Sequence, residues 1–112
     1  MAARLLPSVV RAFAALLLGV SPAASEFFTG SELQAFCDSP NWDEKNPSVC
    51  FGYIIGVASA LDGMSVICIS DEVRARQVED VVKNYLKAHP EKRHDAASAL
   101  VIAALKEKFP CN

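Results

Sequence analysis

The four cysteines are the residues of this 112-residue chain whose chemistry is easiest to assign. They are Cys37, Cys50, Cys68 and Cys111. No two of them form a Cys-x-x-Cys pair, the spacing that is typical of zinc sites. An even number of cysteines in a small domain favours disulfide bonds in an oxidising compartment. We therefore expect two disulfides, and cysteines in disulfides cannot act as catalytic thiolates.

Other side chains that could do chemistry are not spaced for it. The two histidines, His89 and His94, flank a proline in a charged stretch and do not form a helical pair of metal ligands. No Gly-x-Ser-x-Gly turn and no glycine-rich phosphate loop occurs. The carboxylates are expected to be helix caps or to lie on a solvated helix face; they include Asp62, Asp71, Glu72, Glu79 and Asp80. The sequence predicts no catalytic residue, metal or cofactor, and favours a protein that works by binding.

The first 25 residues have the pattern of a secretory signal peptide. Arg4 and Arg11 precede an apolar run of nine residues, 12–20, and small residues follow. Cleavage after Ala23 or after Ser25 would suit a signal peptidase. A membrane anchor is the alternative, but the run is much shorter than the roughly 20 residues that span a bilayer. We expect residues 1–25 to be removed and residues 26–112 to form one exported domain.

The charge of this domain excludes some partners. The chain has 11 basic and 13 acidic residues, and Arg4 and Arg11 lie in the leader, so residues 26–112 carry nine basic and 13 acidic residues and a net charge of −4. Nucleic acids and anionic membrane surfaces are unsuitable partners for such a domain. A basic protein suits it better.

Four helices are expected, and the first two lie before residue 64. Ser31-x-x-Gln34 has the form of a capping box, so the first helix should run from Ser31 to about Asp38. A loop with two prolines follows, in which Trp42 is expected to anchor the chain on the core. The second helix should open at residues 47–48, with Ser48 as its N-cap, and end at Gly63.

The second helix is the one around which the other helices are expected to pack. Its apolar face recurs at helical spacing and consists of Cys50, Tyr53, Ile54, Val57, Ala58 and Leu61. Gly52, Gly56 and Ala60 form a second line at a spacing of four. Each glycine costs a helix about 1 kcal/mol relative to alanine, so we expect another helix, internal or from a second subunit, to approach closely along this line.

The third and fourth helices follow an apolar segment, residues 64–69, that is expected to be a buried crossing loop. Ser70 or Asp71 should cap the third helix, and His89-Pro90 should stop it. Its valines, Tyr85 and Leu86 form the buried side, whereas its charged residues, Glu79 included, are expected to face water. Asp95 should cap the fourth helix, whose apolar face ends at Phe109.

The four cysteines allow three connectivities, and the helix ends rank them. The third and fourth helices are joined by a short turn and should run antiparallel, which brings Cys68 near Cys111. Cys37 ends the first helix and Cys50 begins the second. We favour Cys37–Cys50 with Cys68–Cys111, although the other two connectivities stay open.

The order and spacing of these residues resemble the Rap/Tai immunity proteins of type VI secretion systems. The resemblance runs from about residue 27 to 111 and includes Phe28-Thr29-Gly30, the four cysteines, Gly52-Tyr53-Ile54, Gly56-Val57, Gln77, Val81-Val82, Tyr85-Leu86, His89-Pro90-Glu91, Ala97, Leu100-Val101, Ala104-Leu105 and Phe109-Pro110. The chain departs from the family pattern at Ser59, where an acidic residue is common, and at Ser70, where a proline is common.

The resemblance implies an all-α, periplasmic homodimer, here a bundle of four to five helices braced by disulfides. It also implies an inhibitor that binds a peptidoglycan amidase effector and blocks its active-site groove. An alternative from another class is a small periplasmic chaperone or stress-binding protein, which would have many clients and dissociate in acid. One tight partner would favour the immunity function.

Two turns are the candidate contacts with such a partner. The first is the charged turn that contains Glu91, Lys92, Arg93 and His94. The second is the turn that contains Asp62 and Met64. The resemblance makes Gly52, Tyr53 and Gly56 characteristic of the central helix, and we expect these three to be scaffold residues.

Overall fold

The computed structural model describes residues 27–40 and 45–112. The predicted leader and Trp42 lie outside this part. The described residues form helices α2 (Gly30–Asp38), α3 (Lys45–Gly63), α4 (Ala75–Ala88) and α5 (Ala97–Lys108), and the short 3-10 helix η3 (Pro90–Lys92). The described part contains no β-strand, only an isolated bridge between Thr29 and Ala96. The expected all-α fold is confirmed.

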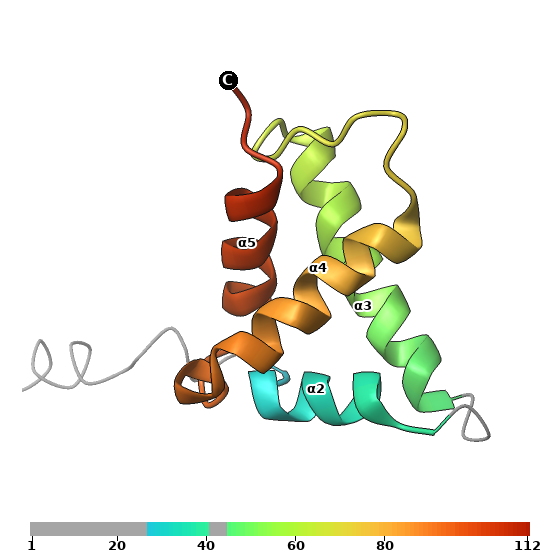
Figure 1. The fold of residues 1–112 in the computed structure, drawn as a ribbon, viewed down its shortest axis with the longest axis vertical. Helices are drawn as coiled ribbons and strands as arrows, with labels where there is room; N and C mark the ends of the chain where they lie inside the picture. Colours follow the sequence, from blue (N-terminus) through green and yellow to red (C-terminus); the bar gives the residue numbers. More distant parts are fainter. Residues whose placement is uncertain (1–26, 41–44) are drawn as a thin grey trace, which may run out of the picture.

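The helices enclose one hydrophobic core. In Figure 1, α4 crosses the face of α3, α5 runs beside them, and α2 lies across one end of the group. The core side chains come from all four α-helices and the segment after α3: Leu33, Cys50, Ile54, Ala58, Leu61, Ile67, Val78, Val82, Leu86, Ala97, Leu100, Val101, Ala104 and Leu105. On α3 and α4 these residues recur at intervals of three to four residues, so the apolar periodicity correctly predicts the buried faces.

Helix α2 begins one residue before the predicted start because its capping box is Thr29-x-x-Glu32. The Thr29 hydroxyl accepts the backbone N–H of Glu32 at 3.2 Å, and the Glu32 carboxylate accepts that of Thr29 at 3.3 Å. The predicted box at Ser31 is wrong. The backbone N–H and the hydroxyl of Ser31 both donate to the carbonyl oxygen of Arg93, at 2.8 and 3.3 Å, so a turn distant in the sequence decides the start of the helix.

The predicted N-caps of α3 and α4 are also wrong. Helix α3 begins at Lys45, so Ser48 lies within its first turns, where Pro47 is tolerated. Ser70 and Asp71 belong to a separate turn in which Val73 donates its N–H to the Ser70 carbonyl at 3.0 Å. Helix α4 starts only at Ala75, and the side chain of Gln77 accepts the N–H of Arg74 at 2.7 Å.

Helix α5 has no side-chain cap, which contradicts the prediction for Asp95. The carboxylate of Asp95 lies 3.2 Å from His94 Nε2 instead, and the N-cap position is Ala96. The N–H of Ala97 donates to the Phe28 carbonyl at 2.8 Å, so the chain before α2 partners the first turn of α5. The predicted stop of α4 at His89-Pro90 and the predicted end of α3 at Gly63 are both confirmed.

Two disulfides join the helix ends as the favoured connectivity predicts. Cys37 pairs with Cys50 and links α2 to α3, with 13 residues of sequence separation. Cys68 pairs with Cys111 across a separation of 43 residues and links the segment after α3 to the end of α5. Both bonds therefore connect elements that also pack against each other.

Among residues 27–40 and 45–112, no helix packs on the glycine line of α3, which faces open space. Apart from its own stretch of helix, a Cβ atom placed on Gly52 or Gly56 would meet no heavy atom of the described residues within 4 Å, and both residues are exposed. The expectation that an internal helix approaches this line is therefore wrong. The core lies on the opposite face of α3, along Cys50, Ile54 and Ala58.

Replacing Gly56 by alanine should stabilise the protein. The site is exposed and helical, so alanine removes the entropic penalty of glycine without a clash, and the free energy of unfolding should rise by up to about 1 kcal/mol. Urea denaturation followed by circular dichroism measures it. Gly52→Ala should behave alike, whereas a loss of stability in both variants would mean that this face is packed in solution.

Candidate partner-binding surface

A short turn follows α3 and projects apolar side chains. The N–H of Met64 donates to the Ala60 carbonyl, that of Ser65 to the Asp62 carbonyl and that of Val66 to the Leu61 carbonyl, at 2.9–3.0 Å. Ser65 has a positive φ of 59°, which reverses the chain. Residues 62–66, called here the apolar turn, are thereby fixed by their own backbone bonds.

The second disulfide braces the apolar turn. The N–H of Cys68 donates to the Phe109 carbonyl at 2.9 Å, and Cys111 Sγ lies 3.6 Å from the Ser65 carbonyl oxygen. The carboxylate of Asp62 accepts the N–H of Ile69 at 3.0 Å, so this predicted contact residue also closes the loop. The apolar turn is therefore held by the hydrogen bond of Asp62 to Ile69 and by the Cys68–Cys111 disulfide.

Only Ile67 of the segment 64–69 is fully buried, so the predicted buried crossing loop is wrong for most of its length. Ile67 enters the core and anchors the segment, whereas Met64 is 65% exposed and Val66 is 40% exposed. Large exposed apolar side chains on a rigid projection are typical of contact residues. A groove of about 350 Å³ lies beside the turn, lined by residues that include Ser59, Asp62, Ile69, Ser70, Asp71 and Val73.

The charged turn, residues 90–94, is built differently. Arg93 donates from Nε to the Leu86 carbonyl at 3.0 Å and from Nη2 to the Lys87 carbonyl at 3.5 Å, so it caps the end of α4. Its own carbonyl holds Ser31 of α2. Arg93 thus has a structural function that was not predicted from its place in the sequence, whereas Glu91, Lys92 and His94 are exposed.

The two turns lie at opposite ends of α5. The apolar turn is bonded near Phe109, and the charged turn precedes Ala97 (Figure 1). Twelve residues of helix extend about 18 Å. The structure therefore does not combine the two predicted contacts into one compact site.

The family model of the Rap1a immunity proteins matches residues 29–111 of the chain. This is most of the sequence and includes every helix of the described residues, both turns and all four cysteines. The chain belongs to the Rap1a immunity protein family. No curated protein matches it.

Membership of the Rap1a family assigns an immunity function and a protein effector as the partner. Such a protein works by binding, and immunity families are generally not enzymes. In the part of the Rap1a chain that the structure describes, no three His, Cys, Asp or Glu side chains are grouped so that they could hold a metal ion. Nor is any helix among residues 27–40 and 45–112 long and apolar enough to cross a membrane.

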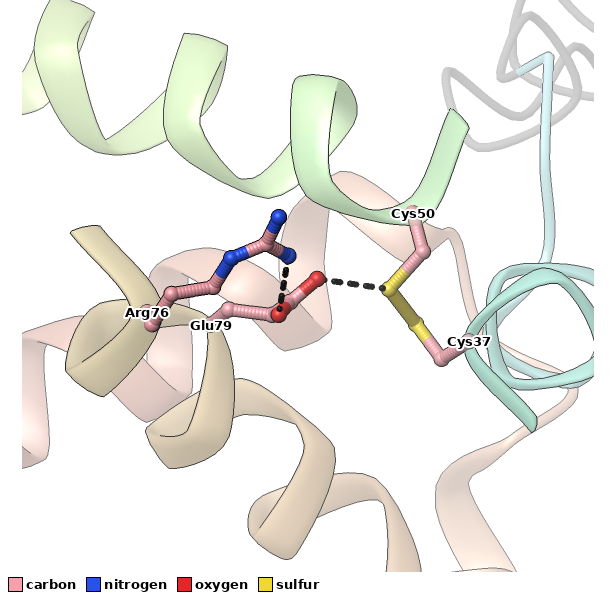
Figure 2. Close-up of polar contacts among 4 residues, drawn as sticks. All are labelled: Cys37, Cys50, Arg76 and Glu79. Atoms are coloured by element: carbon pink, nitrogen blue, oxygen red, sulfur yellow. Dashed lines mark hydrogen bonds and ion pairs between the residues drawn. A yellow bond between two sulfur atoms is a disulfide. The ribbon is translucent and has the colours of Figure 1, made fainter. Parts of the chain in front are cut away.

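One polar cluster of this Rap1a protein was not expected from its sequence. Glu79 was predicted to face water but is only 7% exposed. Its side chain extends from α4 towards α3 and the Cys37–Cys50 disulfide (Figure 2). Its carboxylate pairs with Arg76 at 3.1 Å, and the Arg76 guanidinium lies 4.1 Å from the centre of the Phe51 ring. Arg76 and Glu79 are three positions apart on one helix, and this spacing in the sequence predicts that the two side chains can form an ion pair.

Proposed function

We propose that this Rap1a protein is exported to the periplasm and protects its own cell by binding a peptidoglycan amidase effector of a type VI secretion system. The apolar turn carries the proposal, because occlusion of an active-site groove needs a rigid projection. Its bracing by Cys68–Cys111 reduces the ordering cost of binding. The disulfides themselves favour an oxidising compartment.

The apolar turn is a better first contact than the charged turn. Met64 offers an exposed, adaptable apolar side chain on a fixed backbone, and such side chains dominate many protein interfaces when they enter a pocket. Arg93 is held by α4 and is therefore not free to leave for a partner. Glu91, Lys92 and His94 remain the second candidate contact. The net charge of −4 in residues 26–112 favours a basic groove on the effector.

We expect the substitution Met64→Asp to weaken effector binding by at least about 30-fold. A charge would be forced into an apolar contact that buries the methionine, and losses of about 2 kcal/mol or more are usual at such anchors. Calorimetry with the purified amidase measures the dissociation constant. Growth of cells that produce both proteins in the periplasm tests protection, and the wild-type chain should rescue them.

A variant of the charged turn is the matched control. Glu91→Lys, Lys92→Glu and His94→Glu together change an equally exposed turn and spare Arg93, so the fold should persist. Unchanged binding by this variant, with loss in Met64→Asp, supports the apolar turn. If the charged-turn variant loses binding and Met64→Asp keeps it, the contact lies in the charged turn. Failure of the wild-type chain to bind or rescue rejects the amidase as the partner.

The homodimer that the family resemblance implies is also a proposal. Sedimentation equilibrium of the purified domain tests it, since a dimer has twice the mass of the chain.

Mass spectrometry of the periplasmic protein tests the leader, and an N-terminus at Ala24 or Glu26 is the expected result.

A further inference from the structure

Glu79 is the buried charged group that the proposed partner surface does not use. Its Oε1 atom accepts a hydrogen bond from Arg76 Nη1 at 3.1 Å. Its Oε2 atom lies 3.6 Å from Cys50 Sγ (Figure 2). This sulfur is bonded to Cys37 and carries no hydrogen, so it cannot donate to the carboxylate. A carboxylate therefore lies against a disulfide sulfur without a hydrogen bond between them.

The Glu79 carboxylate is held beside the sulfur by Arg76, which lies on the solvent side. Arg76 binds one oxygen of Glu79, and its guanidinium stacks over Phe51 of α3 at 4.1 Å from the ring centre. The Arg76 side chain is 73% exposed, so water screens its positive charge more than it screens the charge of Glu79. The negative charge of the pair thus acts on the sulfur more strongly than the positive charge.

We propose that Glu79 protects the Cys37–Cys50 disulfide from reduction by thiols. In the reaction that it opposes, the thiolate of a dithiol reductant attacks one disulfide sulfur, the S–S bond breaks, and the other cysteine leaves as a thiolate. The second thiol of the reductant then loses its proton and attacks the mixed disulfide, so that Cys37 also leaves as a thiolate. Both protein thiolates take up protons from the solvent, and the reductant ends as a disulfide. Two electrons pass from the dithiol to the protein.

Burial selects which sulfur can be attacked. Cys50 is only 1% exposed, whereas Cys37 is partly exposed, so a reductant reaches Cys37 more readily than Cys50. Attack on Cys37 makes Cys50 the leaving group, and its negative charge develops beside Glu79 Oε2. A thiol that is hard to ionise is a poor leaving group, so the carboxylate slows the reaction.

The other disulfide lacks this protection and is an internal control. Cys68 and Cys111 are both exposed, and Cys111 Sγ lies 3.6 Å from the carbonyl oxygen of Ser65, which carries no net charge. In the wild-type protein the Cys68–Cys111 bond should therefore be reduced first.

The test compares Glu79→Gln with the wild-type protein under native conditions. Dithiothreitol reduces each protein, alkylation stops the reaction at set times, and mass spectrometry follows each disulfide separately. The rate for Cys37–Cys50 is taken from molecules whose Cys68–Cys111 bond is still intact, so that loss of the second bond does not affect it. Glu79→Gln should speed reduction of Cys37–Cys50 roughly tenfold and leave the rate of Cys68–Cys111 unchanged. Asp80→Asn removes the same charge from an exposed position of α4 and should change neither rate.

Denaturation separates the charge effect from loosening of the fold. In concentrated guanidinium chloride, wild type and Glu79→Gln should reduce Cys37–Cys50 at the same rate, because the carboxylate no longer lies beside the sulfur. Equal native rates for Cys37–Cys50 in the two proteins would overturn the proposal. So would an equal acceleration of both disulfides, which would mean that the variant only unfolds more often. The test does not involve an effector and is independent of the proposed immunity function.

Discussion

Replacing Cys68 and Cys111 by alanine is expected to lower the free energy of unfolding by about 4 kcal/mol. The bond closes a loop of 43 residues, and in the chain-entropy model the stabilisation grows with the length of that loop. Both cysteines are exposed, so the substitution leaves no cavity in the core. For a domain of this size such a loss should lower the melting temperature by roughly 20 °C.

The control for this prediction is the other disulfide. Replacing Cys37 and Cys50 by alanine opens a loop of 13 residues, for which the same model gives about 3 kcal/mol. Loss of the buried Cys50 sulfur and its packing adds to that figure. Thermal and urea denaturation of both double variants measure the two losses. A Cys68, Cys111 variant as stable as the wild type would show that the helices hold the end of α5 without the bond.

The same variant tests the apolar turn as a binding surface. Without Cys68–Cys111 the segment around Ser65 loses its covalent link to the end of α5 and keeps the hydrogen bond of Cys68 to Phe109. A turn that must be ordered on binding loses affinity even when its contacts are unchanged. Effector binding by the folded variant should therefore weaken, mainly through faster dissociation.

Replacing Gly30 by alanine is expected to lower the free energy of unfolding by about 2 to 3 kcal/mol. Gly30 is buried at the start of α2, and a Cβ atom there would collide with Leu100 Cδ1 and lie 3.1 Å from the carbonyl oxygen of Arg93. Leu100 is itself in the core and has little room to move. The backbone of Gly30 does not have a positive φ, so the requirement for glycine here is one of space.

Gly56→Ala is the matched control for Gly30→Ala. Both residues are helical glycines, but the first is exposed and the second buried, so the same change should act in opposite directions. Urea denaturation of the two variants side by side measures the difference. If Gly30→Ala were as stable as Gly56→Ala, α2 would not be packed against α5 and the charged turn as described.

The helix pattern could be predicted from the chain because its causes are local. The apolar residues of α4 recur every four positions, so Val78, Val82 and Leu86 must share one face. Pro90 must stop α4 whatever packs against it. The favoured pairing of Cys68 with Cys111 is also correct, although Cys68 lies in the segment after α3 and not at the start of α4.

The helix starts could not be predicted because they depend on residues that are distant in the sequence. Thr29 and Ser31 both satisfy a capping pattern, and the carbonyl of Arg93 decides between them by holding Ser31. Asp95 has a capping side chain, but the N–H of Ala97 is already bonded to Phe28. Local preference is worth only about 1 kcal/mol at a cap, so a single long-range hydrogen bond can override it.

The contact residues chosen from the sequence, Met64 among them, stay predictions. The sequence determined by itself the family, the helical fold and the favoured disulfides. Only the tertiary structure decided that Arg93 caps a helix, that Gly52 and Gly56 face open space, and that Glu79 lies against Cys50. Periodicity specifies which face of each helix is apolar, whereas the burial of a single polar residue depends on what the neighbouring helix places opposite it.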